Sequence, residues 1–290
     1  MAAPSSPPDP RDRPIAVFDS GVGGLTVLHE LLVRLPHEDF LYLGDTARFP
    51  YGDRSTEELE QFALEIAEAL LRRHAKLLVV ACNSAAGAAL PALRSRMMQT
   101  TLGVDVIAVI TPEAARAVGA TRNGRIGLLA TPATVASGAY DRAVAAVDAF
   151  VELISVPAPD LAPLIQAGSE FDERLVDMVR DYVAPLRAAH VDTVILGCTH
   201  YPLVRPLLQR MLGPGVAIVT SGAALARQVE HALRSRNLSA TRSGEGDYRF
   251  LCTADVESFR ALGTRFLQMP LGEVTHVDLA LTDHEAPIAS

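Results

Sequence analysis

Two cysteines of this chain stand in matching surroundings, and their thiols are well suited to chemistry. Cys82 and Cys198 each end a short aliphatic run that reads as a buried strand. Each is followed by two hydrogen-bonding side chains, Asn83 and Ser84 in the first case and Thr199 and His200 in the second. A thiolate is stabilised where a strand ends and a helix begins. The pattern therefore predicts two thiols that act on one substrate.

A glycine-rich segment, residues 19–24, follows the first predicted strand and opens a helix. Its backbone N–H groups and the Ser20 hydroxyl can hold a carboxylate or phosphate at the helix N-terminus, although a plain tight turn needs the same glycines. The dinucleotide fingerprint is incomplete, because Thr26 stands where its last glycine would be. Asp19 either caps the helix or orients a base.

Further polar residues extend the candidate site. The imidazole of His200 can hydrogen-bond a thiolate or carry a proton, because histidine titrates near neutral pH. Tyr51 and Gly52 lie in the loop after the second predicted strand, where loops line the cleft of a doubly wound fold. An ordinary turn would use the same residues. Cys252 lacks polar neighbours of this kind, and we interpret it as a small apolar filler.

The elements that must position these residues alternate between apolar runs and helical patterns. We expect strands at residues 15–18, 40–43, 77–81, 104–110, 125–130, 151–156, 193–197, 216–220 and 248–252. We expect helices at residues 25–35, 56–74, 85–98, 173–189, 201–212, 223–236 and 256–267. This alternation indicates an α/β fold with doubly wound parallel sheets. A weak repeat of the strand-and-turn pattern predicts two pseudo-symmetric domains, with the active site in the cleft between them.

The expected domain division is discontinuous. Residues 14–104 and 221–270 would form the first α/β domain, and residues 105–220 the second. The Pro-rich residues 1–13 and the residues 271–290 would be tails.

Composition excludes several classes of protein. The net charge is −8 and no basic run occurs, so we expect no nucleic-acid partner. No apolar stretch approaches the ~20 residues that span a bilayer, so we expect no membrane partner. Three cysteines without a CxxC motif favour neither zinc nor disulfides, and a reducing cytoplasm is the simplest location. The only lysine, Lys76, precedes its strand, which argues against pyridoxal phosphate chemistry.

Together these segments resemble the glutamate racemases of the aspartate/glutamate racemase family. The resemblance covers residues 14–267 and is carried by four motifs in order, at residues 15–26, 43–52, 81–85 and 197–203. It implies an enzyme without a cofactor or metal that interconverts L- and D-glutamate and supplies D-glutamate for peptidoglycan. Inversion of a carbon centre by proton transfer needs a base on one face and an acid on the other, which suits paired thiols.

The resemblance also implies a role for each site residue. Cys82 would take the α-proton from D-glutamate and Cys198 from L-glutamate, with Asp19 and His200 tuning the two thiols. Glutamate would be held by Asp19, Ser20, Tyr51, Gly52, Asn83, Ser84, Thr199 and His200. Family members are often dimers, so we expect a homodimer.

Two positions depart from the family pattern. Ser84 stands where threonine is common, which keeps the hydroxyl group. Gln166 stands where a glutamate is usual, and a neutral amide cannot act as a base. Glu170 lies close by in the sequence and is a candidate substitute.

Three other interpretations remain open at this point. A cysteine hydrolase would use Cys198 and His200, and Cys82 would be dispensable. A two-lobed binding protein would hold an amino acid or anion without turnover. A racemase acting on another acidic amino acid, such as aspartate, would use the same thiols.

Overall fold

The computed structural model describes residues 9–99, 103–168 and 172–279 and contains two parallel sheets. The larger sheet has the order β10 (Val274–His276), β9 (Tyr248–Cys252), β2 (Phe40–Gly44), β1 (Ile15–Asp19), β3 (Leu77–Val80) and β4 (Asp105–Ala108). The smaller sheet has the order β6 (Glu152–Pro157), β5 (Arg125–Ala130), β7 (Thr193–Gly197) and β8 (Ala217–Val219). Every strand pair is parallel, which confirms the predicted α/β fold.

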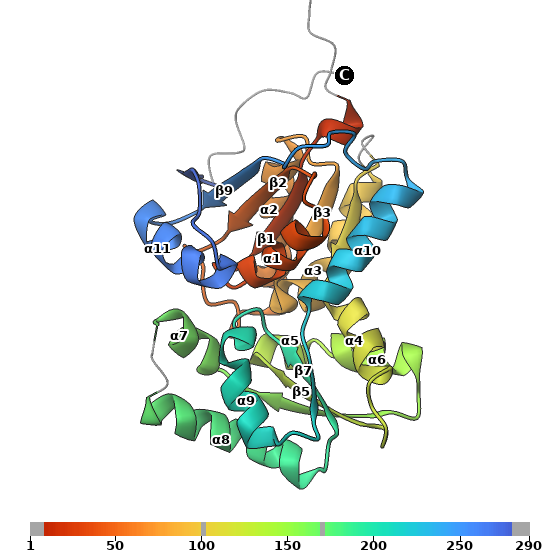
Figure 1. Cartoon of the computed structure of the whole chain (residues 1–290), viewed down its shortest axis with the longest axis vertical. Helices are drawn as coiled ribbons and strands as arrows, with labels where there is room; N and C mark the ends of the chain where they lie inside the picture. The colour runs from red at the N-terminus through yellow and green to blue at the C-terminus, as the bar shows by residue number, and fades with distance from the viewer. Residues whose placement is uncertain (1–8, 100–102, 169–171, 280–290) are drawn as a thin grey trace, which may run out of the picture.

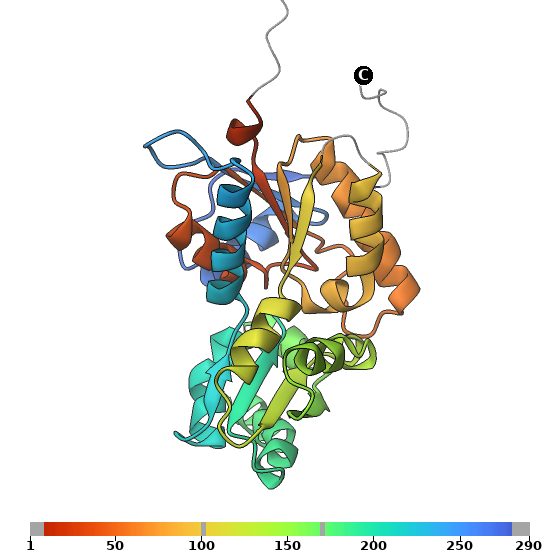
Figure 2. The ribbon, with the colours of Figure 1, turned by 90° about the vertical axis from the view of Figure 1, so that its right-hand side faces the viewer.

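Helices cover both faces of the larger sheet, as Figures 1 and 2 show. On one face lie α2 (Thr56–Leu71) and α3 (Asn83–Met98), and on the other lie α1 (Leu25–Arg34), α10 (Gly222–Ser235) and α11 (Val256–Leu267). No helix among the described residues combines the length and the apolar character needed to cross a bilayer.

The smaller sheet is flanked by α4 (Ile110–Val118), α5 (Pro132–Ala136), α6 (Ala139–Val147), α7 (Leu161–Gln166), α8 (Glu173–Ala188) and α9 (Arg205–Leu212). Among these helices, α4 packs most closely on α6 and α8 on α9. In Figure 1 the larger sheet with its helices occupies the upper part of the molecule and the smaller sheet the lower part.

Sequence explains the central strands. All five residues of β1 are buried, because β1 lies between β2 and β3 and helices cover both of its faces. A strand in that place must be apolar almost throughout. The helix α2 begins at a capping box, in which Ser55 accepts from the N–H of Glu58 and the Glu58 side chain accepts from the N–H of Ser55.

The strand expected at residues 104–110 is shorter than predicted. It ends at Ala108, and Ile110 begins α4, a helix that the sequence analysis did not anticipate. An apolar run reads alike as a buried strand or a buried helix start. Since β4 pairs with β3 in the larger sheet, the boundary expected between residues 104 and 105 is too early. The chain crosses to the smaller sheet after β4.

Other differences concern the C-terminal half and the tails. The helix expected at residues 201–212 is divided into a 3-10 turn, Tyr201–Val204, and α9. Residues 274–276, expected to lie in a tail, form β10 beside β9. Within the expected N-terminal tail, Pro10–Asp12 form a 3-10 turn, whereas residues 1–8 and 280–290 lie outside the described part.

Candidate active site

Cys82 and Cys198 line one cavity, at the edge where the strands of both sheets end. Cys82 follows β3 and is the N-cap residue of α3, and Cys198 follows β7. Their side chains are buried, with 5% and 7% of the residue exposed. They are close enough that a charge on Cys82 raises the pKa of Cys198. The tertiary structure therefore brings together the two thiols that the sequence placed at separate strand ends.

Most of the predicted site residues line this cavity. These are Ser20, Tyr51, Gly52, Cys82, Asn83, Ser84, Cys198, Thr199 and His200. The sequence analysis did not assign to the site the remaining lining residues, Phe49, Pro50, Thr131, Pro159, Ala162, Pro163 and Gly197. Thr131 had a usable signal, because it follows β5 at the same edge of the sheet. The free space is about 20 Å³, which holds about one water molecule.

Asp19, also predicted to belong to the site, is fully buried and is not among the residues that line the cavity. Its carboxylate accepts from the backbone N–H of Gly21 at 3.0 Å and from the Thr199 hydroxyl at 3.3 Å. Burial nevertheless raises its pKa. Asp19 is thus an anchor for the glycine-rich turn and lies close to the Cys82 thiol.

Burial works against thiolate formation at both cysteines. It raises the pKa of Cys82 to about 12, and the charge of Asp19 adds to that effect. The pKa of Cys198 is also raised, again mainly by burial. Hydrogen bonds from backbone N–H groups lower both values but do not compensate for desolvation. The helix N-termini therefore do not by themselves produce the thiolates that the sequence suggested.

His200 is a neutral imidazole, because burial lowers its pKa to about 3. Its Nε2 lies 2.9 Å from the Gln166 Oε1, which can only accept, so Nε2 carries the proton. The other nitrogen, Nδ1, lies 3.8 Å from the Cys198 sulfur and presents a lone pair to it. The rings of Phe49 and Phe266 pack on the imidazole at 5.5 and 5.2 Å. Glu170, the suggested substitute for a carboxylate here, lies outside the described residues.

Hydroxyl and backbone contacts join the two sheets around the cavity. Ser84 on α3 lies 2.8 Å from the Thr131 hydroxyl, and the Gly52 carbonyl accepts from the N–H of Ala133 at 2.9 Å. From the other side, the Thr26 hydroxyl donates to the Thr199 carbonyl at 3.0 Å. The walls of the cavity are thus tied together by polar groups.

A buried charge network positions Tyr51. The Tyr51 hydroxyl donates to Asp45, which also accepts from Arg48 at 2.6 Å and from the Thr253 hydroxyl at 2.8 Å. Arg48 packs over the Phe62 ring at 4.0 Å. The loop that carries Tyr51 and Gly52 is therefore held by side chains from two other segments, Thr253 after β9 and Phe62 on α2.

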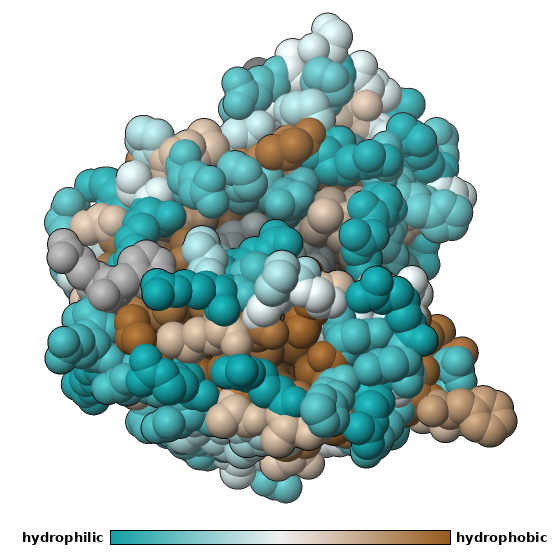
Figure 3. All heavy atoms as spheres, turned by 60° about the horizontal axis from the view of Figure 1, so that its bottom comes forward, coloured by the Kyte–Doolittle hydropathy of each residue, from teal (hydrophilic) through white to brown (hydrophobic). Residues whose placement is uncertain are grey.

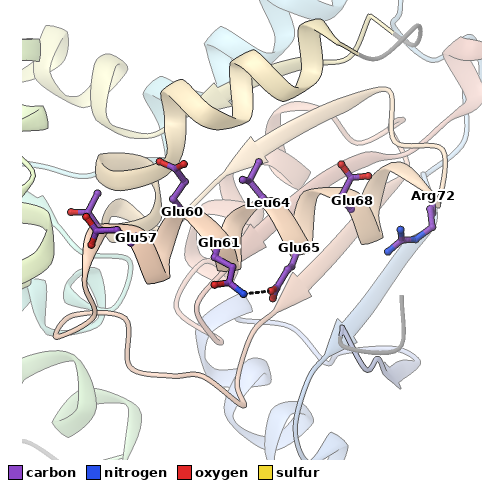
Figure 4. A pocket seen from close by; sticks show the side chains of 8 residues that line it. Glu57, Glu60, Gln61, Leu64, Glu65, Glu68 and Arg72 are labelled. Carbon is purple, nitrogen blue, oxygen red and sulfur yellow. Dashed lines mark hydrogen bonds between the residues drawn. The ribbon is translucent and has the colours of Figure 1, made fainter. Parts of the chain in front are cut away.

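A wider hollow, about 470 Å³, lies along the exposed face of α2, away from both cysteines. Figure 4 shows that the labelled residues lining this hollow all come from one helix, and that several of them are glutamates on the same face.

The outer face of the part built around the smaller sheet is mostly polar, and a group of apolar residues lies within it (Figure 3). Among the described residues, no group of three or more His, Cys, Asp and Glu side chains could hold a metal ion.

The fold and the site define a class of protein, a two-sheet α/β protein with paired thiols at facing strand ends. Residues 27–229 match the family model described as Asp/Glu/Hydantoin racemase. A glutamate racemase from Geobacter metallireducens is 42% identical over 267 residues, 92% of this chain and 97% of that protein. The chain belongs to this racemase family and is an isomerase.

Solved structures agree with this assignment. A glutamate racemase isoform from Bacillus anthracis superposes with a TM-score of 0.87 at 37% identity, over 93% of this chain and 98% of that one. A glutamate racemase from Francisella tularensis, solved in complex with D-glutamate, gives a TM-score of 0.85 at 30% identity over the same shares.

Proposed function

We propose that this protein is a cofactor-independent glutamate racemase that uses Cys82 and Cys198 as its two acid–base groups. The observation that carries the proposal is the convergence of both thiols on one small, buried cavity. The relatives named glutamate racemase, and the neighbour solved with D-glutamate, support glutamate as the substrate. Supply of D-glutamate for peptidoglycan, in the cytoplasm, is part of the same proposal.

The reaction moves one proton off the α-carbon and another onto it. From D-glutamate, the C–H bond breaks toward the thiolate of Cys82, and the S–H bond of Cys198 breaks toward the opposite face of the carbon. From L-glutamate the roles reverse. Protons and charge balance, because one sulfur gains the proton that the other loses.

The resting thiols must first be activated, since burial favours their neutral form. The ammonium group of bound glutamate adds a positive charge to the cavity, and a nearby positive charge lowers a thiol pKa. The lone pair of His200 Nδ1 can accept a hydrogen bond from the Cys198 thiol and so orient its proton. Burial, together with the Asp19 carboxylate when it is ionised, raises the pKa of Cys82 and so makes its thiolate a stronger base.

Hydrogen-bond donors around the cavity would hold the two carboxylates. Ser20, Ser84 and Thr199 line the cavity and carry hydroxyl groups that could serve this purpose. Such fixed donors also stabilise the charge that develops when the α-proton leaves. Because the free space holds about one water molecule, the cavity walls must move apart to admit glutamate.

The test is proton exchange in D₂O with D-glutamate and no added cofactor, followed by NMR and by the appearance of L-glutamate. We expect the wild-type protein to lose the α-proton signal and to form L-glutamate. C198S should exchange the α-proton of D-glutamate without inversion, and C82S should do the same with L-glutamate. C252S is the matched control, because Cys252 is buried away from the cavity and donates to the Ala254 carbonyl.

Other outcomes select the alternatives. Exchange of aspartate but not glutamate would keep the chemistry and change the substrate. A fully active C82S variant would contradict the two-thiol mechanism and favour a nucleophilic Cys198. Binding of glutamate without any exchange would favour the binding-protein interpretation.

A further inference from the structure

A buried carboxyl group outside the cavity contacts the site through Asn83. Glu113 lies in the first turn of α4 and is fully buried. Its Oε1 accepts from the Ser221 hydroxyl at 2.6 Å, and its Oε2 accepts from the Tyr140 hydroxyl and from the Asn83 Nδ2 at 3.2 Å. These partners come from α3, α6 and the residue that caps α10. The chain crosses between the two sheets just before α4 and again just before α10. Glu113 therefore links both crossings to Asn83, which lines the cavity.

Only the nitrogen end of the Asn83 side-chain amide has hydrogen-bond partners among the described residues. Its Nδ2 donates to the Glu113 Oε2 at 3.2 Å and to the neighbouring Tyr140 hydroxyl at 2.7 Å. Its Oδ1 is buried and has no hydrogen-bond partner within the described part of the chain. An unpaired buried acceptor is costly. Here it belongs to a residue that lines the cavity next to Cys82.

Glu113 determines which end of that amide is free. If the amide turned over, Oδ1 would face the Glu113 Oε2 and two acceptors would repel each other. Protonation of the carboxyl does not remove this preference, because Oε2 already accepts from two donors. The proton would lie on Oε1, where the Ser221 oxygen can accept it. The amide thus keeps Oδ1 free in either state of Glu113.

We propose that Glu113 is a positioning residue that, with Tyr140 and Ser221, keeps the Asn83 Oδ1 available to a hydrogen-bond donor of the substrate. The ammonium group is the hydrogen-bond donor that glutamate carries at neutral pH, so it is the group that Oδ1 would receive. This identification of the donor rests on the proposed function, whereas the orientation of the amide rests on the contacts alone.

The test compares two substitutions of Glu113. E113Q can place its amide oxygen toward Asn83 and Tyr140 and its NH₂ group toward Ser221, so it reproduces the protonated acid. E113M has a similar length but no acceptor, so the Asn83 amide is free to turn. We expect E113Q to keep KM for glutamate within about twofold, and E113M to raise KM about tenfold or more with a smaller change in kcat.

A double-mutant cycle separates positioning from general destabilisation. In an N83A background, E113M should raise KM no further, because the residue through which Glu113 acts is gone. Additive effects of the two substitutions, or a lower melting temperature of E113M with an unchanged KM, would overturn the proposal. If the wild-type protein failed to racemise glutamate, the proposed function would fail before any variant was compared. Binding of D-glutamate to E113Q and E113M, measured by calorimetry, would still test the orientation of Asn83.

Discussion

At the residue scale, the site is built from groups whose ordinary acid–base properties are changed by burial. Two thiols and the imidazole of His200 are kept neutral, and the hydrogen-bond partner of that imidazole is the neutral amide of Gln166. With Nε2 protonated toward Gln166, the ring presents an acceptor to Cys198. The Gln166 amide therefore selects the tautomer of His200 that can accept a hydrogen bond from the Cys198 thiol.

Q166L tests that role of Gln166. The Nε2–H loses its buried acceptor, so the imidazole no longer prefers the tautomer that accepts from Cys198. We expect kcat/KM to fall about tenfold. The fall must be equal in both directions, since enantiomers have equal free energy. The primary deuterium isotope effect should rise more with L-glutamate, from which Cys198 takes the proton. Q166E still accepts from Nε2–H and should stay within about threefold of wild type; a Q166E variant as impaired as Q166L would contradict this account.

Glu113 also gives the fold a dependence on pH. Burial raises its pKa from 4.5 to about 8. The folded protein then holds a proton that the unfolded chain releases, so the free energy of unfolding falls as pH rises from 4.5 to 8. Tyr140 is the titratable group that contacts it, and Asn83 and Ser221 are neutral. His200 is also buried, which lowers its pKa from 6.5. It therefore affects the free energy of unfolding below pH 6.5, where its contribution makes that free energy rise with pH.

Between pH 6.5 and pH 8, the contribution of Glu113 can therefore be isolated. We expect urea unfolding of wild type to show decreasing stability across that interval and E113Q to show a flatter profile. The quantity to compare is the slope of the unfolding free energy against pH, in the wild type and in E113Q. Parallel profiles would show that Glu113 has an ordinary pKa.

At the scale of elements, parallel strands end at one edge and helix N-termini approach closely there. Gly23, just before α1, lies against the Cys198 segment: an added Cβ would come within 2.3 Å of the Thr199 Oγ1 and 2.5 Å of the His200 Nδ1. The close approach of α1 to the second sheet therefore requires glycine at this position.

G23A should displace Thr199 and His200 from their places. We expect a loss of about 1–3 kcal/mol of stability from overpacking and at least about a tenfold fall in kcat/KM, because small displacements of acid–base groups are costly. G215A is the matched control, since no heavy atom lies within 4 Å of its added Cβ. Thermal melts measure the stability of both variants, and racemisation assays measure their kcat/KM. A G23A variant as active as the wild type would show that the close contact is not needed.

At the scale of the whole molecule, the two ends of the larger sheet have different tasks. The carboxyl ends of the strands carry the site, whereas Lys76, just before β3, closes the opposite end. Its ammonium group donates to Glu38 at 2.5 Å, to the Arg11 carbonyl at 2.6 Å and to the Leu238 carbonyl at 3.0 Å. The ion pair and the two carbonyl contacts together join Lys76 to three segments that are distant from it in the sequence.

K76M should therefore act on stability alone. Removal of one partner leaves the Glu38 carboxylate buried and uncompensated, which costs about 3–5 kcal/mol. We expect a lower midpoint of urea unfolding and unchanged KM and kcat for the protein that remains folded. The double variant K76M/E38L should recover much of the loss. A change in KM with K76M would contradict the separation of the two ends.

The homodimer stays a prediction. Light scattering would test it, because a dimer has twice the 30.9 kDa mass of one chain.

The sequence by itself determined the class of fold and most of the site. Aliphatic runs that end in polar residues mark strand ends in a parallel sheet, and this rule located Cys82 and Cys198, whereas Tyr51 was predicted from its place in the loop after the second strand. It could not find Glu113, because the run before it was interpreted as strand, and the partners of Glu113 come from segments far apart in the chain.

Tertiary structure alone decided the point where the chain crosses between sheets, the pairing of β10 with β9, and the protonation of the site. The reason is the same in each case. Burial and strand pairing depend on which distant segments pack together, and local sequence does not contain that information. The helix N-terminus at Cys82 predicts a thiolate, but the surrounding elements remove water from the thiol, and desolvation is the larger effect.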